Sequence, residues 1–114
     1  MGFVKTLFQK IANREIPATF VYEDELCAAI PDIHPQAPVH LLVFPKNLLR
    51  LTSATPADEA LLGHLLFVAQ KVAQEASLDK GFRIVINQGP LAGETIPHLH
   101  LHILGNRPLH WPPG

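Results

Sequence analysis

The stretch His98-Leu99-His100-Leu101-His102-Ile103-Leu104 carries the strongest structural pattern in this chain. Side chains of a β-strand alternate between the two faces of a sheet. The alternation of imidazole and aliphatic groups therefore predicts one strand with three histidines on one face and Leu99, Leu101 and Ile103 on the other. The aliphatic face can pack against a helix, which leaves the histidine face for chemistry or for water.

The segments around this strand predict one α+β domain over residues 1–114. Apolar and β-branched runs predict further strands at residues 19–23, 26–30, 39–45 and 82–87. Helical spacing of apolar residues predicts a short helix over residues 6–13 and a long helix over residues 55–77. Thr6-Leu7-Phe8-Gln9 has the capping-box pattern, and Thr55-Pro56 opens the second helix. The 31–38 loop is rich in proline, and the 88–93 loop is rich in glycine.

The composition argues against several classes of protein. With 47% hydrophobic and 17% charged residues, the 114-residue chain fits a globular domain better than a disordered one. Its 9 basic and 10 acidic residues provide no positive excess for nucleic acid. The single Cys27 cannot form an internal disulfide, and we expect a cytoplasmic protein.

We also expect no membrane span and no signal peptide, since no apolar run approaches about 20 residues. Met1-Gly2 begins a loose N-myristoylation pattern that many unmodified proteins share. Histidine is the unusual residue of this chain, because seven occur in so short a sequence. Since imidazole titrates near neutrality and ligates metals, this number indicates a site.

Three interpretations of the histidine face remain open from the residues alone. The face could simply be solvated. It could bind zinc, with His40 as a third imidazole and Cys27 as the one available thiol. It could instead carry nucleophilic or acid–base catalysis, because the glycine-rich loop that precedes the strand could hold an anion such as phosphate.

The alternating histidines resemble the signature of the histidine triad (HIT) family, and the similarity to its Hint branch covers nearly the whole chain. It extends to Ile16-Pro17-Ala18, Asp32-Ile33-His34-Pro35-Gln36-Ala37-Pro38-Val39-His40, Val43-Phe44-Pro45-Lys46, Asn87-Gln88-Gly89 and His110-Trp111-Pro112-Pro113-Gly114. The resemblance implies a HIT-like fold, with a five-stranded antiparallel sheet, a short N-terminal helix and one long helix. It also implies a homodimer in which two protomers join into a continuous ten-stranded sheet.

The resemblance implies hydrolysis of purine nucleoside 5'-phosphoramidates, without a metal or another cofactor. His100 would attack the α-phosphorus and form a nucleotidyl-histidine intermediate that water resolves. An imidazole with a pKa near ~6.5 is largely unprotonated at neutral pH and can attack without a strong base. By family position, His98, His102 and His40 would orient His100 and share protons.

The same resemblance assigns the nucleotide contacts. Asp32 would bind both ribose hydroxyls, although an aspartate here could also cap its loop. Asn87, Gly93 and Thr95 would lie at the phosphate, and Asn87 could equally serve a turn. Apolar residues that could also be plain core would surround the purine, namely Phe8, Ile11, Ile16 and Ile30. Trp111 would reach the site of the partner protomer, or else anchor its own tail.

Three residues depart from the family pattern. Glu94 stands where a neutral amide is common, and a carboxylate near phosphate is unfavourable unless it faces away or pairs with a cation. Pro97 removes a strand donor, so we expect the last strand to start only at His98. His34 is a solvated loop residue in this interpretation, and neither His64 nor His110 belongs to the site.

Two other functions compete with phosphoramidate hydrolysis. A sister branch of the family hydrolyses dinucleoside polyphosphates, but it typically has Gln in place of the last triad histidine. His102 and the Trp-Pro-Pro-Gly end at residues 111–114 argue against that branch. The other alternative is a non-enzymatic nucleotide-binding scaffold that acts by binding a partner protein.

Overall fold

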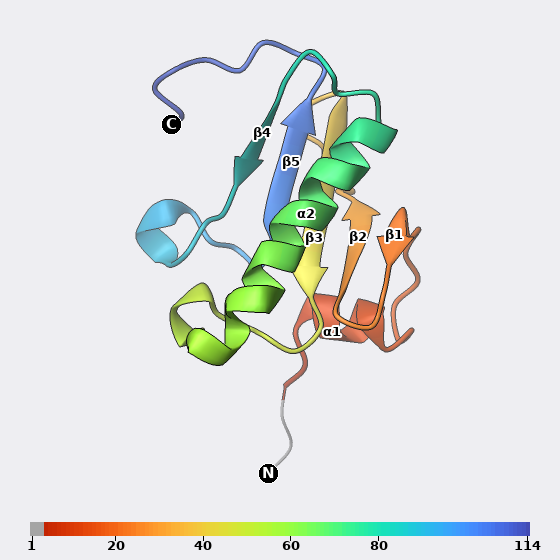
Figure 1. The fold of residues 1–114 in the computed structure, drawn as a ribbon, viewed down its shortest axis with the longest axis vertical. Coiled ribbons are helices and arrows are strands. Elements are labelled where there is room, and N and C mark those ends of the chain that lie inside the picture. Colours follow the sequence, from red (N-terminus) through yellow and green to blue (C-terminus); the bar gives the residue numbers. More distant parts are fainter. Residues whose placement is uncertain (1–3) are drawn as a thin grey trace.

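In the computed structural model, which describes residues 4–114, five strands form one antiparallel sheet with a long helix across one face (Figure 1). The strands are β1 (Tyr22–Glu23), β2 (Cys27–Pro31), β3 (Val39–Pro45), β4 (Phe82–Val85) and β5 (Leu101–Gly105), in the order β1-β2-β3-β5-β4. The α-helices are α1 (Leu7–Ala12) and α2 (Glu59–Glu75), and short 3₁₀ helices span Leu51–Ser53, Pro56–Asp58 and Pro90–Ala92. The expected fold is confirmed. The first three residues of the myristoylation pattern, Met1–Phe3, lie outside the described residues.

The sheet separates two apolar clusters. Alternate residues of β3 point to opposite faces, so Leu41 and Val43 pack under α2, whereas Leu42 and Phe44 face α1. Leu99, Leu101 and Ile103 join the cluster under α2, as the alternation predicts. On the other face the Phe8 ring stacks on Phe44, with their ring centroids 4.6 Å apart. The histidine face therefore lies on the α1 side of the sheet.

The N-terminal helix starts as its sequence predicts. The Thr6 hydroxyl accepts a hydrogen bond from the Gln9 N–H at 3.1 Å, and the Gln9 side chain accepts one from the Thr6 N–H at 2.8 Å. This reciprocal capping box satisfies two donors at the start of α1. It also holds Thr6 in an extended conformation next to the histidine face.

Some element boundaries differ from the predicted ones. Strand β5 begins at Leu101 and not at His98, because the Leu99 N–H donates to the Leu49 carbonyl in the loop after β3. The first strand shortens to Tyr22–Glu23. The first turn of the long helix is a 3₁₀ helix at Pro56–Asp58, followed by α2. No helix within residues 4–114 is long and apolar enough to span a membrane.

Candidate active site

A cleft of about 770 Å³ opens on the α1 face of the sheet. This volume suits a small organic ligand. Most of the residues assigned to the site by the sequence line it, namely Phe8, Ile11, Ile16, Ile30, Asp32, His40, Asn87, Gly93, Thr95, His100 and His102. His98 and Trp111 are absent from the lining. The fold thus brings together residues from both halves of the chain.

The backbone fixes the proton on the His100 ring. Its Nδ1 lies 2.6 Å from the carbonyl oxygen of His98, two residues earlier. A carbonyl can only accept a hydrogen bond, so we assign the proton to Nδ1. In the neutral ring, Nε2 then keeps its lone pair. His100 is 5% exposed and lines the cleft, so its Nε2 offers a lone pair in one fixed orientation, as nucleophilic attack requires.

His98 does not line the cleft, but its carbonyl oxygen holds the His100 ring that does. The His98 Nε2–H donates to the Pro45 carbonyl at 2.7 Å, and its Nδ1 accepts from the Thr6 hydroxyl at 2.7 Å. The residue is 1% exposed, and burial lowers the pKa of its ring below the usual value. Both ring nitrogens are therefore occupied in the neutral state. The geometry gives His98 a part in orienting His100 through its carbonyl, but no free nitrogen for proton sharing.

His40 and His102 form a hydrogen-bonded pair beside His100. The Gln36 N–H donates to His40 Nδ1 at 3.0 Å, so the proton of the neutral His40 ring is on Nε2. That Nε2–H faces His102 Nδ1 at 2.8 Å and Asp32 Oδ2 at 3.3 Å. His102 Nδ1 is then an acceptor, which leaves the proton of the His102 ring on Nε2. This arrangement leaves His102 an N–H donor, and the centroids of the His100 and His102 rings are 4.9 Å apart.

Burial keeps this imidazole pair neutral. It lowers the pKa of His40, an effect that the Asp32 charge opposes. For His102, burial, followed by the proximity of His100 and His40, lowers the pKa to about 4. The donor atoms of Asp32, His40 and His102 lie within 4.8 Å of one another and could also hold a metal ion. The cleft thus contains two of the histidines that the zinc interpretation requires, His40 and His102, together with Asp32. Cys27 is not among the residues that line it.

The glycine-rich loop before the triad is a 3₁₀ turn with a glycine at each end. Gly89 has φ 92° and Gly93 has φ 84°, conformations that favour glycine. The Gly93 N–H donates to the Pro90 carbonyl inside the turn, so it is not a free donor for the phosphate beside which the resemblance places Gly93. Within residues 4–114 the Thr95 N–H has no hydrogen-bond acceptor. It is the better candidate for an anion contact.

Arg50 is a residue that the sequence reasoning missed. Its Nη1 lies 2.7 Å from Glu94 Oε1. This ion pair joins the loop after β3 to the glycine-rich loop. Glu94 therefore has the cation partner that a carboxylate near a phosphate site needs. The two residues are 44 positions apart, and no local motif indicates their contact.

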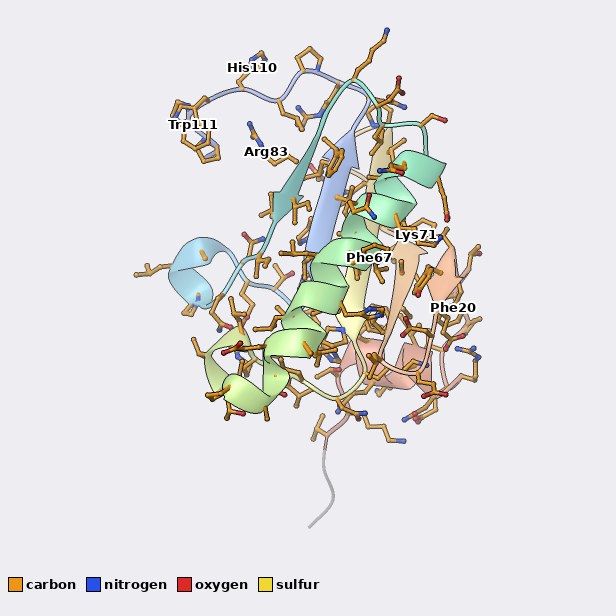
Figure 2. All side chains as sticks on the ribbon, viewed as in Figure 1. Phe20, Phe67, Lys71, Arg83, His110 and Trp111 are labelled. Carbon is orange, nitrogen blue, oxygen red and sulfur yellow. The ribbon has the colours of Figure 1, made fainter. Side chains whose placement is uncertain are left out.

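The C-terminal tail leads away from the cleft of its own chain. Trp111 is 81% exposed. Figure 2 shows Trp111 and His110 on the tail, beyond the outer strand β4. Arg83 on β4 holds this part of the tail through a hydrogen bond to the His110 carbonyl at 2.7 Å. Within a single chain, Trp111 therefore takes no part in the cleft.

The fold and the cleft together define a class of α+β protein, one with alternating histidines at the inner wall of a ligand-sized cleft. Residues 13–109 match the HIT domain, and the chain belongs to this family. It is 58% identical over 110 residues to an uncharacterized HIT-like protein of Synechocystis, with 96% of each chain covered. It is 48% identical over 112 residues to a 14 kDa zinc-binding protein of Zea mays, covering 96% of this chain and 88% of that protein.

The solved structures agree with this family assignment. The crystal structure of a HIT family hydrolase from Legionella pneumophila superimposes with a TM-score of 0.93 at 45% identity, covering 96% of this chain and 100% of that one. The fold of this protein is therefore that of a HIT family hydrolase.

Proposed function

We propose that this protein is a purine nucleoside phosphoramidase of the Hint branch, which cleaves the P–N bond of substrates such as adenosine 5'-monophosphoramidate. The observation that carries the proposal is the fixed ring of His100, whose Nδ1 is held by the His98 carbonyl and whose Nε2 is left free. We infer that this nitrogen attacks the α-phosphorus.

In the first step His100 Nε2 forms a bond to phosphorus while the P–N bond of the substrate breaks. The electron pair of that bond leaves with the amine nitrogen, which must gain a proton. The His102 Nε2–H is the proposed hydrogen-bond donor to the departing nitrogen, since the hydrogen bond from His40 to its Nδ1 leaves the ring proton on Nε2. The transferred proton comes from solvent, because a neutral imidazole that released its only ring proton would become an imidazolate. The products of this step are the free amine and a nucleotidyl-histidine.

In the second step water attacks the same phosphorus, and the bond to His100 Nε2 breaks. The electron pair returns to that nitrogen, which restores the nucleophile. The water proton passes to solvent, and His102 keeps its ring proton throughout. The enzyme thus returns to its starting protonation state, and the net reaction consumes one water.

The proposed nucleotide position follows the polarity of the cleft. Phe8, Ile11 and Ile30 offer an apolar wall for the purine base. Asp32 Oδ1 accepts from the His34 N–H at 2.8 Å, and the carboxylate retains lone pairs for the ribose hydroxyls. Asn87 and Thr95 lie on the phosphate side in this proposal.

A His100→Ala variant tests the proposal. We expect it to lose phosphoramidate hydrolysis while it retains nucleotide binding, with thermal unfolding as the control for folding. Retention of wild-type hydrolysis would exclude the mechanism. A parallel assay with diadenosine polyphosphates separates this activity from that of the sister branch, because faster cleavage of those substrates by the wild-type protein would favour the alternative.

We also propose that the protein is a cytoplasmic homodimer. Strand β4 is an outer strand that begins with the exposed apolar residue Phe82 and is followed directly by exposed Ile86. Pairing of two such edges would cover apolar surface and unpaired backbone groups together. The unpaired Cys27 suits a reducing compartment.

A further inference from the structure

A second cluster of metal-ligating side chains lies on the opposite face of the sheet from the cleft. Asp24 comes from the β1–β2 turn, Cys27 is the first residue of β2, and His64 lies on the second turn of α2. Their ligand atoms all lie within 4.8 Å of one another. Cys27 belongs to the core cluster under α2, and none of the three residues lines the cleft.

The Asp24 carboxylate is held in place from both sides. Its Oδ1 accepts from the backbone N–H groups of Leu26 and Cys27 at 2.8 and 2.9 Å. Its Oδ2 accepts from His64 Nε2 at 2.6 Å and from the Tyr22 hydroxyl at 2.7 Å. Hydrogen bonds of this kind orient the carboxylate ligands of metal sites.

The Cys27 thiol takes no part in the proposed hydrolysis. Its side chain is 0% exposed, and burial raises the pKa of the thiol to about 12. It is therefore neither accessible to a substrate nor nucleophilic at neutral pH. A bound cation changes this state, because a coordinating thiol is deprotonated outright.

We propose that Asp24, Cys27 and His64 form a site for a divalent transition-metal ion of the Zn²⁺ type. Sulfur, imidazole nitrogen and carboxylate oxygen are the ligands that such ions take, and hard cations such as Mg²⁺ do not prefer this set. The carboxylate and the thiolate together balance the two positive charges of the ion. A water molecule or the Tyr22 hydroxyl would complete a tetrahedral set.

Binding exchanges a hydrogen bond for metal–ligand bonds. The short contact between His64 Nε2 and Asp24 Oδ2 opens, the ion takes the place of the shared proton, and the thiol proton leaves to solvent. The ring proton of His64 is then held on Nδ1. The ion would fasten the β1–β2 turn to α2 and so stabilise the half of the sheet that carries neither His100 nor His102.

Titration of the full-length, metal-free protein with Co²⁺ tests this site, because a thiolate ligand produces a sulfur-to-cobalt charge-transfer band. We expect about one ion per chain, the charge-transfer band, and displacement of the cobalt by Zn²⁺. Zinc at about 100 times its Kd should raise the Tm by about 10 °C. The Cys27→Ser variant should lose the band, and His64→Gln should weaken binding by at least about tenfold.

The matched control is His102→Gln, which removes a ligand from the other candidate cluster, at Asp32 and His40. The proposal requires that this variant keep both the band and the affinity. Cobalt binding without the band, or binding lost in His102→Gln and kept in Cys27→Ser, would assign the metal to the cleft and overturn the proposal. Absence of binding would overturn it as well.

Discussion

Thr6 connects the start of α1 with the candidate active site through one hydroxyl group. That hydroxyl accepts from the Gln9 N–H as a helix cap and donates to His98 Nδ1. In Thr6→Ala the cap is lost and a buried ring nitrogen loses its partner, so we expect a loss of about 2–3 kcal/mol of unfolding free energy. Urea denaturation measures it, and Thr6→Ser is the matched control. Equal losses in both variants would show that the hydroxyl is not the cause.

The buried histidines predict how stability depends on pH. A histidine in the unfolded chain titrates near 6.5, whereas burial lowers the pKa of His40, His98 and His102 in the folded protein, that of His102 to about 4. Between these values the unfolded chain binds more protons than the folded one, so stability falls as the pH falls. We expect the Tm to decrease steadily from pH 7 to pH 5.

A His102→Gln variant provides the control for this pH dependence. It removes one titrating ring, and its Tm should therefore fall less steeply over the same range than that of the wild-type protein. Carboxyl groups contribute little between pH 7 and pH 5, because their ordinary pKa values of about 4 leave them ionised in the unfolded chain at these pH values. In the folded protein the pKa values of Glu15, Glu23 and Asp24 are lower still, so they are ionised in both states. A wild-type Tm that is constant between pH 7 and pH 5 would contradict the prediction.

At the scale of elements, the ion pair between Arg50 and Glu94 connects two loops at one end of the cleft. Glu94 lies between Gly93 and Thr95, which both line the cleft. Arg50→Gln leaves the carboxylate without its cation near the expected phosphate position. We expect the KM for a phosphoramidate substrate to rise by about three- to tenfold, with a smaller change in kcat.

A double variant separates charge from structure in this loop pair. Glu94→Gln alone should leave the KM close to the wild-type value, because it removes the anion that opposes the phosphate. The single Arg50→Gln variant is expected to raise the KM. Combining it with Glu94→Gln should return the KM to a value near that of the wild-type protein. If the double variant binds substrate as weakly as Arg50→Gln, the arginine contributes through packing and not through charge.

The sequence predicts those features of the elements that depend on local spacing. Alternation over residues 98–104 placed the leucines under α2, and the Thr6–Gln9 pattern placed the start of α1. The sequence could not show that the Leu99 N–H donates to the Leu49 carbonyl. Because of this contact, β5 begins at Leu101 and not at His98. The partners of His98 are equally remote, since Thr6 and Pro45 precede it by 92 and 53 residues. Such contacts depend on the packed fold.

For the whole molecule, the exposed tail raises the question of which site Trp111 serves. The side chain stands beyond β4 (Figure 2), and it does not line the cleft of its own chain. In the proposed dimer joined along β4, the same tail would lie next to the partner. We therefore expect Trp111→Ala to impair hydrolysis, although the residue contacts no group of its own site.

Mixing two impaired proteins tests whether this contribution crosses between protomers. His100→Ala lacks the nucleophile but keeps Trp111, and Trp111→Ala keeps the nucleophile. In a mixed dimer the Trp111→Ala protomer would receive the partner's intact tail, so its site should regain wild-type kcat/KM. After exchange at equal concentrations about half of the dimers are mixed, and activity should exceed the average of the two proteins. Light scattering measures the oligomeric state, and a monomer would exclude the exchange. Activity equal to that average would confine Trp111 to its own chain.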